Sequence, residues 1–96
     1  MPYISQPSRA GLDAHIDALA KEIRALANAD GYDGAFAGPL NYCCTRLALQ
    51  VIPARKSWAI ALVTGVFKNI ADEFYRRYGV PYEDEKITEH GDAYEA

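Results

Sequence analysis

The stretch from Ser57 to Tyr78 constrains the fold more than any other part of the chain, because its apolar pattern is too long and too dense for a strand. Every residue from Trp58 to Val63 is apolar. The second half keeps a single apolar stripe, formed by Phe67, Ile70, Phe74 and Tyr78. The pattern predicts a continuous helix over residues 57–78, about 33 Å long, whose first half is enclosed by other helices or other chains.

Two further long helices are predicted before it. The first covers about residues 8–28 and carries a narrow apolar seam of the kind that lies against another helix. The seam consists of Leu12, Ile16, Leu19, Ile23 and Leu26. The second helix covers about residues 39–52, since Pro39 suits its first position and Pro53 ends it. Ser57 is expected to cap the long helix that follows.

Glycine and proline predict the remaining boundaries. Three glycines without a clear period predict a loop over residues 30–38. Gly79 and Pro81 are expected to end the long helix and to precede a short C-terminal helix over about residues 82–90. The chain shows no strand pattern, so the expected fold is an all-α helical bundle in a single domain, residues 1–96.

Composition excludes several classes of function. The net charge is −3, so non-specific binding to nucleic acid is not expected. The segment 82–96 is acidic, with six carboxylates against one lysine. No apolar run approaches the ~20 residues of a membrane-spanning helix, and the N-terminus lacks the pattern of a secretory signal. Cys43 and Cys44 are adjacent and too close for an ordinary disulfide, which favours a reducing cytoplasm.

The long helix carries more apolar surface than two neighbouring helices can cover. One stripe contains Trp58, Leu62 and Val66, and another contains Ile60, Val63 and Phe67. Burial of each large side chain contributes roughly 1.5–3 kcal/mol, which favours a homo-oligomer with the Trp58 end or the first-helix seam at the interface. The alternative is a monomer in which the 30–38 loop, with Tyr32 and Phe36, covers the remaining surface.

Several motifs resemble those of a set of small, uncharacterised bacteriophage and prophage proteins. The matching segments are Glu73-Phe74-Tyr75-Arg76-Arg77, Pro81-Tyr82-Glu83-Asp84-Glu85-Lys86 and Gly91-Asp92-Ala93-Tyr94, together with Leu40-Asn41-Tyr42 and the first four residues. His90 and Ala93 stand where the group often has Asn and Val. The resemblance implies an accessory protein acting in the cytoplasm of a bacterial host, and it carries no known activity.

Two groups of residues are candidates for binding an anionic ligand. Arg76 and Arg77 are surrounded by tyrosines that can stack on a base: Tyr75, Tyr78 and Tyr82. The alternative is that the arginines complement the helix dipole and pair with nearby acids such as Asp72 and Glu73. Arg55, Lys56 and Ser57 precede the long helix, where free N–H groups attract anions. The alternative there is a solvated turn with a serine cap.

Metal and cofactor signatures are weak. Acidic pairs occur at Asp13 and Asp17, at Glu85 and Glu89, and at Asp72 and Glu73. Helical pyrophosphohydrolases hold Mg²⁺ with such acids, but their paired E-x-x-E motif is missing. The histidines and cysteines lack zinc spacing. We therefore predict no metal, no cofactor and no catalytic residue.

The favoured function is a non-catalytic, oligomeric phage-type protein that binds or sequesters a nucleotide-like ligand, by analogy with helical phage proteins that sequester second messengers of host defence. The ligand-binding residues would be Arg55, Lys56, Ser57, Tyr75, Arg76, Arg77, Tyr78 and Tyr82. The first alternative is an adaptor that binds a host or viral protein. The second is a Mg²⁺-dependent nucleotide pyrophosphohydrolase.

Overall fold

The protein is helical throughout the part that the structure describes. The structure is a computed structural model and describes residues 2–95. Its long elements are α1 (Gln6–Asp30), α2 (Ala37–Val51), α3 (Ser57–Phe74) and α4 (Val80–His90). The short elements are the 3₁₀ helices η1 (Asp33–Phe36) and η3 (Ala93–Glu95), and the π-helical segment η2 (Tyr75–Gly79). No strand occurs within residues 2–95, so the all-α prediction is confirmed.

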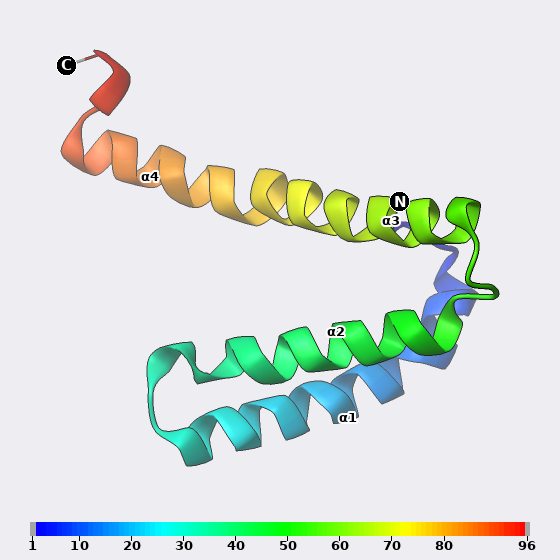
Figure 1. Cartoon of the computed structure of the whole chain (residues 1–96). Helices are drawn as coiled ribbons and strands as arrows, with labels where there is room; N and C mark the ends of the chain where they lie inside the picture. Colours follow the sequence, from blue (N-terminus) through cyan, green and yellow to red (C-terminus); the bar gives the residue numbers. More distant parts are fainter. Residues whose placement is uncertain (1, 96) are drawn as a thin grey trace.

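Helices α1 and α2 form an antiparallel hairpin (Figure 1). Gly31 ends α1 in the left-handed region, with φ 75°. The predicted seam lies against α2 along its C-terminal half, where Leu19, Ile23 and Leu26 line a groove with residues of α2. Those residues of α2 include Pro39, Tyr42 and Cys43.

The turn of the hairpin is more ordered than the glycines indicate. The predicted loop over 30–38 contains η1, and α2 begins at Ala37 rather than at Pro39. Pro39 is therefore the third residue of α2 and not the first. This placement is tolerated because the first helical residues have no intrahelical acceptor for their N–H groups.

The prediction that the long helix ends at Gly79 is wrong. Helix α3 continues through η2 into α4 as one rod (Figure 1). Pro81 cannot donate a hydrogen bond within a regular helix, but the backbone widens before it, and the N–H of Val80 bonds to the carbonyl of Tyr75. Gly79 contributes by leaving room, because a Cβ at this position would lie 2.7 Å from the Tyr75 ring. The short helix after it spans Val80–His90 rather than 82–90.

The hairpin and the rod diverge from the connection at residues 52–56, so one chain does not close into a bundle (Figure 1). The radius of gyration is 17.3 Å, against about 12–13 Å for a compact chain of this length. Among residues 2–95, only Ala35 and Ala59 are fully buried. The predicted helices are present, but a single chain provides almost no core.

The 30–38 segment reaches only one edge of the surplus apolar surface of α3, where Phe36 and Ala37 border the same hollow as Phe67. It lies at the far end of the hairpin from the connection to α3 (Figure 1). Tyr32 and Phe36 are themselves more than half exposed, and the side chain of Trp58 remains 59% exposed. Most of the apolar surface of α3 therefore stays exposed in the single chain.

Candidate functional site

The first group of candidate residues lies where the hairpin joins the rod. Arg55 and Lys56 belong to the connection, and Ser57 is the first residue of α3. The predicted serine cap is wrong by one position: Lys56 occupies the N-cap, with an extended backbone and no side-chain hydrogen bond. Its carbonyl accepts a hydrogen bond from the N–H of Ile60 at 2.9 Å, which closes the first turn. All three side chains are exposed.

The two arginines of the second group differ in their surroundings. The Nε of Arg76 donates a hydrogen bond of 3.1 Å to Glu73 Oε1, and the two side chains form a salt bridge. Arg76 therefore adopts the structural pairing that the sequence offered as the alternative to ligand binding. Arg77 instead lines a groove together with Tyr3 and Phe74. No salt bridge forms to Arg55, Lys56 or Arg77 within residues 2–95.

The three tyrosines do not form one stacking platform. Tyr78 stacks on Phe74, with ring centroids 5.2 Å apart and an interplanar angle of 17°. Tyr82 lies under the ammonium group of Lys86, at 5.3 Å from the ring centroid, and Tyr75 packs beside Gly79. Each tyrosine is more than half exposed, so each ring keeps a face available to a second molecule.

The structure brings the candidate residues together in two sets and not in one. Arg55, Lys56 and Ser57 precede α3, whereas Arg76 and Arg77 follow it. At a rise of 1.5 Å per residue the two sets are about 30 Å apart along the rod. A nucleotide-sized ligand cannot contact both sets in one chain, so any site that uses all of them needs residues from a second chain.

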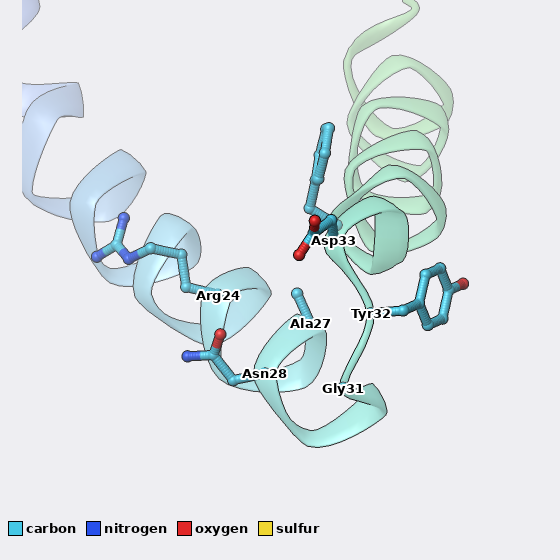
Figure 2. A pocket seen from close by; sticks show the side chains of 7 residues that line it. Arg24, Ala27, Asn28, Gly31, Tyr32 and Asp33 are labelled. Atoms are coloured by element: carbon cyan, nitrogen blue, oxygen red, sulfur yellow. The ribbon is translucent and has the colours of Figure 1, made fainter.

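A hollow at the turn of the hairpin contains residues that sequence reasoning missed. It has a volume of about 370 Å³ and is bordered by Arg24 and Asn28 of α1 and by Asp33 and Phe36 of η1. Figure 2 shows Arg24 and Asn28 on the α1 side, while the Tyr32 ring points away from them. The one signal in the sequence is the spacing of four between Arg24 and Asn28, followed by Gly31. One cation, Arg24, and one anion, Asp33, border the hollow, so its side chains favour neither an anionic nor a cationic ligand.

A second groove, of about 440 Å³, runs between the N-terminal segment and the rod. Pro2 and Tyr3 line one side of it, and Val66, Ile70 and Phe74 contribute apolar side chains from α3. Sequence reasoning missed this groove because the first residues carry no helical period that relates them to α3. The groove places the N-terminal segment beside Arg77.

Metal-ligating residues do not gather within the described part of the chain. No group of three or more His, Cys, Asp or Glu side chains suited to a metal ion occurs in residues 2–95. Cys43 and Cys44 are free thiols and half-buried in the hairpin. No helix in the described residues has both the length and the apolar character needed to cross a membrane.

The family assignment rests on a match over almost the whole chain and not on any one site. A family model described as a domain of unknown function, DUF6899, matches residues 1–93. The chain belongs to the DUF6899 family. This agrees with the resemblance to an uncharacterised family seen in the motifs. No curated protein and no solved structure matches this DUF6899 chain.

Proposed function

We propose that the protein is a non-catalytic homo-oligomer that binds a small anionic, nucleotide-like ligand at sites formed between copies of the chain. The observation that carries this proposal is the open protomer. Its accessible surface is 8456 Å², whereas a compact protein of 10.6 kDa exposes about 5,500 Å². The excess of about 3,000 Å² is more than one partner contributes to most obligate dimers, which bury roughly 2,000–5,000 Å² in total.

The apolar character of this excess surface favours a protein partner over solvent. On α3 alone, several large apolar side chains are about half exposed or more: Trp58, Ile60, Leu62, Val66, Ile70 and Phe74. Monomeric proteins rarely expose contiguous apolar patches of this extent. Another copy of the same chain offers the same apolar surface, so association covers both.

The proposed ligand class rests on charge and on the exposed aromatic rings. Arg55, Lys56 and Arg77 have no carboxylate partner within residues 2–95. Arginine and lysine bind phosphate through charge-assisted hydrogen bonds. Tyr78 and Tyr82 add exposed rings that can stack on a base, which contributes roughly 1–3 kcal/mol per base in single-stranded nucleic acid complexes.

The biological setting comes from the motif resemblance. We place the protein among bacteriophage accessory proteins that act in the cytoplasm of a bacterial host. There a nucleotide second messenger of host defence is the ligand that a sequestering protein would bind.

Calorimetric titration tests the ligand class, with cyclic dinucleotides, ADP-ribose derivatives and nucleoside triphosphates as probes. One of these classes should bind the native protein, and Arg55→Ala/Lys56→Ala should weaken binding at least tenfold, because each charge-assisted contact contributes about 1.5–3 kcal/mol. Lys21→Ala, at an exposed position of α1, is the matched control and should bind normally. An oligomeric protein that binds none of the three classes would contradict the proposal.

The groove beside the N-terminal segment favours a second candidate function, an adaptor that binds a host or viral protein. Its lining is largely apolar, with Val66, Ile70 and Phe74 on one side and Tyr3 on the other. A folded chain that stays monomeric, and that buries this groove against one partner protein, would support the adaptor. A stable homo-oligomer that binds a nucleotide would reject it.

A further inference from the structure

We propose that two copies of the chain pair through antiparallel α3 helices, with a two-fold axis beside Phe67. The pairing joins the two separated halves of the candidate site. The ligand that this joined site would bind is the one given in the proposed function, and that part of the inference rests on it. The occupant of the open α3 face is a second copy of the same chain.

Phe67 is the midpoint of an apolar stripe on α3, with Ile60 and Phe74 seven residues to either side of it. The members of this stripe follow spacings of three, four, three and four: Ile60, Val63, Phe67, Ile70 and Phe74. These spacings match two helices that cross at about 20°. An antiparallel partner centred on Phe67 sets Ile60 opposite the partner's Phe74, and both side chains are about half exposed or more in the single chain. One two-fold operation therefore lays the two stripes along each other, with Val63 opposite the partner's Ala71 and Ile70 opposite the partner's Thr64.

The charges along the rod select the antiparallel direction. The connection that precedes α3 carries Arg55 and Lys56, whereas α4 carries four acids and one lysine. Parallel rods would place two acidic α4 helices side by side, and like charges in contact are unfavourable. Antiparallel rods separate the acidic helices and bring each basic connection to within one or two turns of the partner's Glu83.

The same operation assembles the candidate site. With the axis at residue 67, Arg55, Lys56 and Ser57 lie level with residues 79, 78 and 77 of the partner. Each end of the α3 pair then combines two cations of one copy with the partner's Arg77 and the partner's Tyr78. The dimer has two such sites, each incomplete in one chain, and each takes a ligand that carries phosphate and a flat base.

A spin-label distance tests the direction of pairing without any ligand. In a protein whose Cys43 and Cys44 are replaced by serine and whose native mass is checked, Glu85→Cys places one label in α4 of each copy. Antiparallel rods put the two labels about 50 Å apart, whereas parallel rods put them within about 20 Å. Lys68→Cys, level with the axis, should give a short distance in either case. A short distance at residue 85, or an oligomer with an odd number of copies, would overturn the pairing.

Mixed oligomers test whether the site is shared. Arg55→Ala/Lys56→Ala and Arg76→Ala/Arg77→Ala should each lose binding of the nucleotide identified by titration. An equimolar mixture that is unfolded and refolded together should recover binding, at one ligand per mixed dimer, because one of its two sites contains only native residues. No recovery in the mixture would overturn the shared site. If the native protein binds no nucleotide but the labels at residue 85 still lie about 50 Å apart, the ligand proposal is rejected and the antiparallel pairing is supported.

Discussion

At the residue scale, two glycines of the hairpin have opposite roles. Gly31 ends α1 with φ 75°, a conformation that L side chains rarely adopt. Gly11 lies inside α1, and a Cβ there would meet nothing within 4 Å. The left-handed backbone at position 31 requires a glycine, whereas Gly11 only lowers the stability of the helix.

Alanine substitution should separate these two roles. Gly31→Ala should lower the free energy of unfolding by about 1–2 kcal/mol, because the left-handed conformation is strained for alanine. Gly11→Ala should raise it by about 0.5–1 kcal/mol, since alanine favours a helix interior. Urea unfolding at one fixed chain concentration measures both changes. Equal effects of the two substitutions would show that the end of α1 is not formed as described.

The residue scale also shows why the candidate site was only partly predictable. The pairing of Arg76 with Glu73 follows from a spacing of three on a helix, which the sequence displays. The position of Lys56 rather than Ser57 at the N-cap depends on one backbone conformation that residue type does not determine. The groove beside Tyr3 depends on contacts between distant parts of the chain, which helical spacing does not report.

At the element scale, the rod from α3 to α4 differs most from the sequence expectation. The first residues of the three long helices follow from periodicity and turn residues to within two positions, and the structure places the apolar stripe of α3 on one continuous helix. Gly79 and Pro81 predict a stop because proline removes a hydrogen bond and clashes with the preceding turn. The π-helical segment at Tyr75–Gly79 resolves that conflict, and such a local widening has no periodic signature in the sequence.

The apolar face of α3 yields a prediction at the same scale. Ile60, a member of the proposed pairing stripe, is 49% exposed in the single chain, so Ile60→Glu would be harmless in a monomer. In an oligomer that covers this face, the substitution should remove roughly 1.5–3 kcal/mol of burial per chain and shift the protein to smaller species on size exclusion. Lys68→Glu, at an exposed position outside the apolar face, is the control and should keep the native elution volume. Unchanged elution of both variants would show that α3 is not covered by another copy.

At the scale of the whole molecule, folding and association should be one process. A chain with two fully buried residues among those described cannot offset the conformational entropy of ordering its helices. The midpoint of thermal unfolding should therefore rise with chain concentration, as mass action requires of a folded state that exists only in the oligomer. Circular dichroism melts over a hundredfold range of concentration measure this dependence. A midpoint independent of concentration would indicate that the chain folds alone.

Sedimentation equilibrium in dilute solution tests the central claim most directly, because it measures the mass of the folded particle without labels or ligand. The two-fold pairing of open protomers predicts an even multiple of 10.6 kDa for the folded protein, and loss of helical circular dichroism wherever dilution produces the single chain. A stable, fully helical particle of 10.6 kDa would contradict the account, since its apolar surfaces would then need no second copy.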